Sequence, residues 1–101
     1  MILTGTKSLT NTVTNIESRM SDKYGVAFLV GGKKCFNFRD TFFIISGLKW
    51  SQTRESIIMA EYADSINDAK KGLFSEDGDA FYIDEMSEND IFNALIKEVE
   101  A

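Results

Sequence analysis

The sequence predicts an α+β fold, in which a mostly antiparallel sheet of four or five strands is packed by N- and C-terminal helices. Two amphipathic patterns with helical spacing, at residues 8–24 and 87–99, bracket the chain. Between them lie short runs of strand-forming residues separated by glycines and polar turns. The 101 residues are 44% hydrophobic and contain no proline, repeat or linker, so we expect a single domain, residues 1–101.

The first helix is predicted from apolar side chains that recur every three or four positions and so line one side of a helix. These residues are Leu9, Val13, Ile16, Met20 and Tyr24. Ser8 or Thr10 is a suitable N-cap, because a hydroxyl oxygen can accept a free backbone N–H of the first turn. Gly25 stands where a glycine commonly ends a helix.

Residues 26–38 predict a β-hairpin, in which two runs of strand formers are separated by the glycine pair 31–32. A two-residue loop at these glycines would pair Phe28 with Cys35. A three-residue loop pairs Phe28 with Phe36 instead and gathers the bulky side chains of both strands on one face. We therefore predict the three-residue loop.

The middle of the chain predicts a buried strand. Residues 42–46 are apolar on both faces, as in a central strand that is covered on each side, and residues 47–52 are expected to form a connection. Residues 54–62 fit a strand, or a helix that continues to Ala69. We favour the strand, followed by a short helix at residues 65–71.

A loop at residues 73–79 and a short strand at residues 80–83 precede the last helix. In the helical pattern at residues 87–99, Ser87 is a suitable N-cap, with Asp90 three positions later as in a capping box. The predicted buried stripe consists of Ile91, Phe92, Leu95, Ile96 and Val99.

The net charge of −5 is unevenly distributed. Residues 1–54 contain eight bases and three acids, a net charge of +5, whereas residues 55–101 contain three bases and thirteen acids, a net charge of −10. An acidic half of this kind disfavours direct nucleic-acid binding and favours a basic protein partner.

The chemistry of the residues disfavours catalysis. The chain contains no histidine, the commonest general base, and its single cysteine, Cys35, excludes an internal disulfide. A helix-loop-helix calcium loop centred on Gly78 would place its first ligand at Leu73, whose side chain cannot bind a cation. We therefore expect a protein that is not an enzyme and that has no metal site and no cofactor.

The densest cluster of acids, residues 69–85, suggests a docking surface for a basic protein, since complementary charge accelerates encounter. An equally simple interpretation is a solvated acidic face that prevents aggregation. A docking surface also needs buried apolar anchors, for which the candidates are Phe74, Phe81, Tyr82 and Trp50. The predicted partner-binding residues are Glu61, Asp64, Asp68, Phe74, Glu76, Asp77, Asp79, Tyr82, Asp84 and Glu85.

The segment EYADSINDAKKGLFSEDGDAFYI, followed by the acidic helix SENDIFNALIKEVE, resembles immunity proteins of bacterial polymorphic toxin systems, including contact-dependent growth inhibition. The resemblance covers residues 55–101. It implies a small, cytosolic, non-enzymatic protein that binds a secreted toxin's toxic domain, often across a nuclease active site lined with basic residues. The acids would then stand in for substrate phosphates.

Neither a signal peptide nor a membrane-spanning run of residues is expected, so the predicted location is the cytoplasm. The alternative function is a small acidic adaptor or a nucleic-acid mimic, for example a phage-encoded inhibitor of a DNA-binding enzyme. The sequence leaves the oligomeric state and the identity of the toxin open.

Overall fold

The computed structural model describes residues 8–49 and 54–101 and contains three helices and five strands in the described residues. In chain order the elements are α1 (Leu9–Tyr24), β1 (Phe28–Val30), β2 (Lys33–Phe38), β3 (Thr41–Lys49), β4 (Ser56–Ala63), α2 (Ile66–Lys70), β5 (Phe81–Tyr82) and α3 (Glu88–Val99). The predicted α+β fold with an antiparallel sheet and terminal helices is confirmed. None of the described helices is long and apolar enough to cross a membrane.

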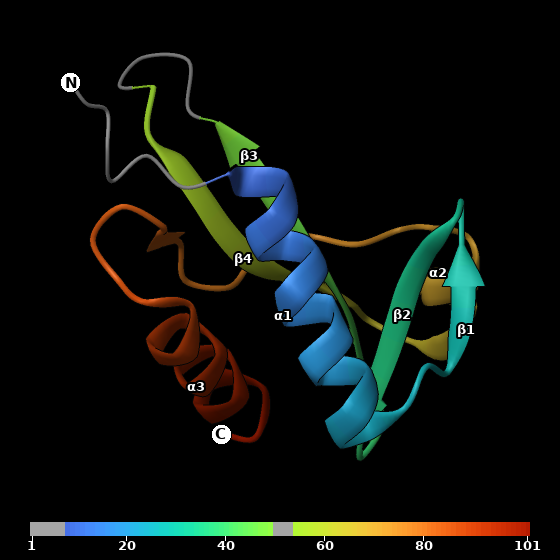
Figure 1. Ribbon diagram of the computed structural model, residues 1–101. Helices are drawn as coiled ribbons and strands as arrows, with labels where there is room; N and C mark the ends of the chain where they lie inside the picture. The colour runs from blue at the N-terminus through green and yellow to red at the C-terminus, as the bar shows by residue number, and fades with distance from the viewer. Residues whose placement is uncertain (1–7, 50–53) are drawn as a thin grey trace, which may run out of the picture.

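The five strands form one open sheet in the order β1-β2-β3-β4-β5, and every neighbouring pair is antiparallel. The strand β3 is central, as its two-sided apolar pattern predicts. Figure 1 shows α1 and α3 together on one face of the sheet and α2 behind the β1–β2 hairpin. Each face of the sheet therefore has its own helical cover.

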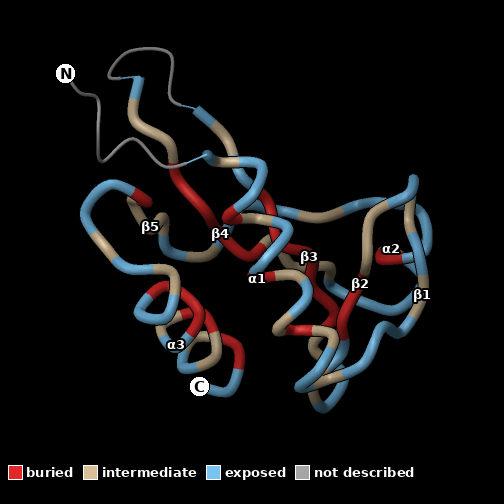
Figure 2. Tube along the Cα trace, viewed as in Figure 1, coloured by how far each residue is buried: buried red, intermediate tan, exposed pale blue. Residues whose placement is uncertain are grey.

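The main core lies between the sheet and the two long helices. Ile16 and Met20 of α1, Phe43 and Ile45 of β3 and Leu95 of α3 are fully buried there. A second cluster lies on the opposite face and joins Cys35, Phe42, Ile44 and Ala69, with Phe28, Val30, Ala63 and Phe74 packed against it. Figure 2 shows the buried stretches running along β3 and β4.

The helix boundaries follow the predicted capping residues. Ser8 is the N-cap of α1 and accepts the backbone N–H of Asn11. Gly25 ends this helix with a φ of 75°, a conformation that costs glycine little. The predicted strand at residues 54–62 is confirmed as β4, and the helix that follows it has Ser65 as its N-cap.

The predicted three-residue hairpin loop is wrong. Phe28 pairs with Cys35 and Val30 with Lys33, so the loop is the two-residue turn of Gly31 and Gly32. Both glycines have positive φ, as in the type I′ turn whose twist matches that of the flanking strands. Bulky side chains need not gather on one face, because both faces of this sheet carry an apolar cluster.

Two further boundaries differ from the prediction. Residues 47–49, expected in a connection, extend β3, because they pair with Ser56, Ile57 and Ile58 of β4. The strand β1 begins at Phe28 and leaves Val26, predicted to lie in it, 41% exposed. The rest of the expected connection, residues 50–52, lies outside the described residues.

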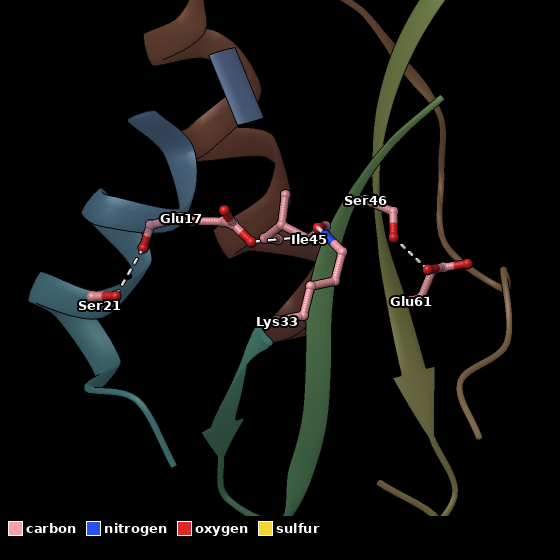
Figure 3. Close-up of polar contacts among 6 residues, drawn as sticks. All are labelled: Glu17, Ser21, Lys33, Ile45, Ser46 and Glu61. Atoms are coloured by element: carbon pink, nitrogen blue, oxygen red, sulfur yellow. Dashed lines mark hydrogen bonds and ion pairs between the residues drawn. The ribbon is translucent and has the colours of Figure 1, made fainter. Parts of the chain in front are cut away.

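The strand β2 pairs with β3 over a short stretch, with Phe36 opposite Phe43 and Phe38 opposite Thr41. Figure 3 shows how Lys33 bridges the space where β2 leaves β3. Its Nζ donates to the backbone oxygen of Ile45 at 2.6 Å and lies 3.8 Å from a carboxylate oxygen of Glu17. A lysine thus satisfies a strand carbonyl that no neighbouring strand reaches.

Candidate partner-binding surface

The acids of residues 72–96 face solvent without counter-charges. This segment contains seven acids and no lysine or arginine. Five of the predicted binding residues, Glu76, Asp77, Asp79, Asp84 and Glu85, are exposed here. Within the described part of the chain, none of the five forms an ion pair. We call these five residues the acidic strip.

The acidic strip runs along the edge of the sheet next to β4. Ser75 and Tyr62 exchange two backbone hydrogen bonds, of 3.0 and 2.8 Å, and Tyr82 of β5 pairs with Ile57. Tyr62 and Ile57 are five residues apart, about 17 Å in an extended strand. The acids before β5 therefore lie beside the C-terminal half of β4, and those after β5 lie near its N-terminal end. Figure 1 shows β5 and its flanking loops beside β4 and α3.

Glu98 of α3 fixes the loop that carries the first three acids. One of its carboxylate oxygens accepts the backbone N–H of Asp79 at 2.8 Å, and the other accepts the hydroxyl of Tyr62. The carboxylate thus joins the last helix, the strand β4 and the acidic loop. The loop is held in one conformation before any partner arrives.

Gly78 leaves room for this arrangement. A Cβ built on Gly78 would lie 2.5 Å from Oε2 of Glu98 and 2.9 Å from the backbone oxygen of Ala60. Both distances are below any normal carbon–oxygen contact, so a side chain at this position requires the loop to move. Gly78, where the sequence disfavours a calcium loop, is a site of close approach between the loop and β4.

Two tyrosines join the C-terminal end of α3 to the sheet and to α1. Tyr62 donates to Glu98, and Tyr24 at the end of α1 donates to Glu100 at 2.6 Å. Their rings flank Phe43, with centroid distances of 6.2 and 5.9 Å. Burial, followed by the hydrogen bond and the negative charge of the glutamate, raises the pKa of each hydroxyl well above its ordinary value. Both tyrosines therefore remain protonated donors at neutral pH.

The other predicted acids lie around the end of β4. Glu61 is half-buried, on the face of the sheet opposite the long helices, and its carboxylate accepts the hydroxyl of Ser46 (Figure 3). Asp64 is exposed just beyond β4, and Asp68 is half-buried in α2. These three residues lie on or beyond the strand end that the first acids of the strip approach.

The predicted apolar anchors differ in their availability. Phe74 is half-buried and packs against the second core cluster, as Phe81 does against the main one. Tyr82 and Phe81 are half-buried in β5, at the centre of the acidic strip. Trp50 lies outside the described residues. The two residues of β5 are therefore the described aromatic candidates that have acids of the strip on both sides in the sequence.

Sequence reasoning missed Glu98 as a part of this surface. Its position was informative, because Ile91, Leu95 and Glu98 follow the i, i+4, i+7 spacing of one helix face. A carboxylate in line with two buried residues is expected to point toward the protein, where it needs hydrogen-bond donors. Tyr62 and the backbone of Asp79 supply them.

The described residues contain no group of three or more histidine, cysteine, aspartate or glutamate side chains arranged to hold a metal ion. Comparisons of the chain with protein-family models, curated proteins and solved structures found no match. The charge and geometry of this surface are therefore the structural observations that bear on function.

Proposed function

We propose that this protein is a cytoplasmic immunity protein that binds and neutralises the toxic domain of a secreted bacterial toxin, and that it acts by binding rather than by catalysis. The observation that carries the proposal is the acidic strip, whose five exposed carboxylates have no counter-ion among the described residues. A basic protein surface is the natural complement of such a strip, because opposite potentials steer encounter and fix the register of the complex.

The toxin that fits best is a nuclease. Its active site binds phosphates and is therefore lined with positive charge. A row of carboxylates that follows about 17 Å of extended strand can occupy such a groove in place of a nucleic-acid backbone. The attachment of the loop to Glu98 supports this function, since a loop that is already ordered loses less conformational entropy on binding.

The test is growth protection against the toxin encoded beside this protein's gene, combined with the affinity of the purified pair at increasing salt. Three double variants, each raising the net charge by two, map the contribution of the strip. They are Glu76→Gln with Asp77→Asn, Asp84→Asn with Glu85→Gln, and, as the control on the basic half, Asp22→Asn with Asp40→Asn.

Each strip variant should weaken binding by about three- to tenfold, mainly through slower association, and the control should change it less than about twofold. Binding by the unaltered protein should weaken steadily as salt rises, because exposed charges are screened. Protection that survives both strip variants, together with salt-independent binding, would refute this surface. Failure to neutralise the toxin at all would refute the function.

A further inference from the structure

A pocket of about 410 Å³ opens beside the acidic strip, between the loop before β5 and the C-terminal half of α3. Phe81 and Ala94 form its apolar walls, while Asp79, Lys97 and Glu98 bring charged groups to it. The pocket lies in the same part of the surface as the half-buried anchor Phe81. It is therefore a recess into which a partner's side chain can enter.

Of the two side-chain carboxylates that line the pocket among the described residues, that of Asp79 is the free one. Both oxygens of Glu98 already accept hydrogen bonds, from Tyr62 and from the backbone of Asp79. The side-chain carboxylate of Asp79 is exposed and makes no hydrogen bond or ion pair with any described residue. Because the backbone N–H of Asp79 is held by Glu98, this side chain starts from a defined backbone position beside the pocket.

An apolar wall that includes an aromatic ring, with a carboxylate at its rim, is suited to an arginine side chain. The aliphatic stem can cover the apolar wall, while the planar guanidinium stacks on the ring and donates to the carboxylate. The protein itself contains a related combination on the other side of α3, with an amide oxygen in place of the carboxylate. There Arg19 lies 3.9 Å from the ring centre of Phe92 and donates to Oδ1 of Asn89 at 2.9 Å.

We propose that the pocket between Asp79, Phe81 and Ala94 receives one arginine side chain of a basic protein partner. The inference rests on the proposed function, to which it adds the chemical group that anchors the partner. Among the described residues that line the pocket, Lys97 carries the one positive charge, and it opposes a positively charged occupant. Neutralising Asp79 and neutralising Lys97 should therefore change the affinity for an arginine side chain in opposite directions.

The experiment is an NMR titration of the isotopically labelled full chain with Nα-acetyl-arginine amide. The corresponding citrulline amide, which has nearly the same shape but no charge, is the control probe. The arginine probe should selectively shift the amide signals of Asp79, Phe81 and Ala94, with millimolar affinity, and the citrulline probe should shift them much less. The protein variants are Asp79→Asn, Lys97→Gln and the control Asp77→Asn, whose carboxylate does not line the pocket.

Asp79→Asn should weaken arginine binding about threefold, Lys97→Gln should strengthen it about twofold, and Asp77→Asn should change it less than either. Stronger arginine binding by Asp79→Asn together with weaker arginine binding by Lys97→Gln would identify an anionic occupant and overturn the proposal. Equal shifts with both probes, or no selective shifts, would also overturn it. The titration needs no toxin, so a failed pocket with intact growth protection rejects this inference alone, whereas failed protection rejects the proposed function.

Discussion

Replacing Gly78 with alanine tests whether Glu98 and β4 fix the conformation of the acidic loop. The new Cβ would lie 2.5 Å from Oε2 of Glu98 and 2.9 Å from the backbone oxygen of Ala60. The first atom belongs to a side chain that is held by two hydrogen bonds, and the second belongs to a central part of β4. Neither atom can move away without breaking other contacts.

The expected destabilisation follows from two opposing effects. Forcing an extra carbon into a packed site costs about 1–3 kcal/mol. Replacing glycine by alanine also restricts the unfolded chain, which stabilises the folded state by about 0.4–1 kcal/mol. We therefore expect Gly78→Ala to lower the free energy of unfolding by about 1–2 kcal/mol, which corresponds to a melting temperature roughly 5–10 °C lower for a domain of this size.

Urea denaturation of four proteins measures this effect and its origin. They are the unaltered protein, Gly78→Ala, Glu98→Ala and the double variant. Removing the Glu98 carboxylate deletes the closer contact and leaves the one with Ala60, so Gly78→Ala should cost about half as much in the Glu98→Ala background. A cost below about 0.5 kcal/mol for Gly78→Ala alone, or an equal cost in both backgrounds, would refute the role assigned to this contact.

Two further predictions concern the tyrosines and the hairpin turn. The pKa of Tyr62 and of Tyr24 is raised above the ordinary value of 10.0 in the folded protein. Above pH 10 the unfolded chain therefore releases protons that the folded chain retains. The free energy of unfolding should fall as the pH rises through this range. Urea unfolding at rising pH should show this decline, and Tyr62→Phe should make it shallower; a decline of unchanged steepness would contradict the assignment. Gly32 has a φ of 82°, so Gly32→Ala should cost about 1 kcal/mol in the same assay, whereas an unchanged midpoint would show that the turn tolerates a side chain.

Most of the fold could be predicted from local patterns. The helices α1 and α3 follow from apolar residues spaced three or four apart, and capping serines mark where they begin. The alternation in β4 also predicts its two faces, since Ala60 and Tyr62 share the side of the long helices while Glu61 faces the other way. These features depend on neighbours in the sequence and need no knowledge of the tertiary structure.

The hairpin register could not be predicted in this way. It depends on whether one or both faces of the sheet are covered, and the cover of the second face is the short helix α2. A helix of five residues, with Ala69 as its buried residue, is a weak signal in the sequence. The prediction assumed one buried face and chose the wrong loop. Register is a tertiary property wherever both faces of a strand are apolar.

The candidate surface was only partly predictable for a similar reason. Exposure of the acids followed from their polar surroundings in the sequence. The places of the acids along β4 depend on the pairing between Tyr62 and Ser75. The attachment of the loop to Glu98 depends on the placement of α3. The packing of the predicted anchor Phe74 against the second core cluster was also not predictable, because it depends on α2, which brings the chain back across the second face of the sheet.

The strip's two ends should contribute differently to a complex. Near Gly78 the backbone is fixed by Glu98, so Asp79 presents its charge without further ordering of the loop. The same end has the pocket and the aromatic wall of Phe81, which can exclude water from a charge pair. Asp84 and Glu85 lie on an exposed turn beyond β5 and would act mainly by steering encounter. Neutralising Asp79 should therefore accelerate dissociation of a partner, whereas neutralising Asp84 and Glu85 should slow its association.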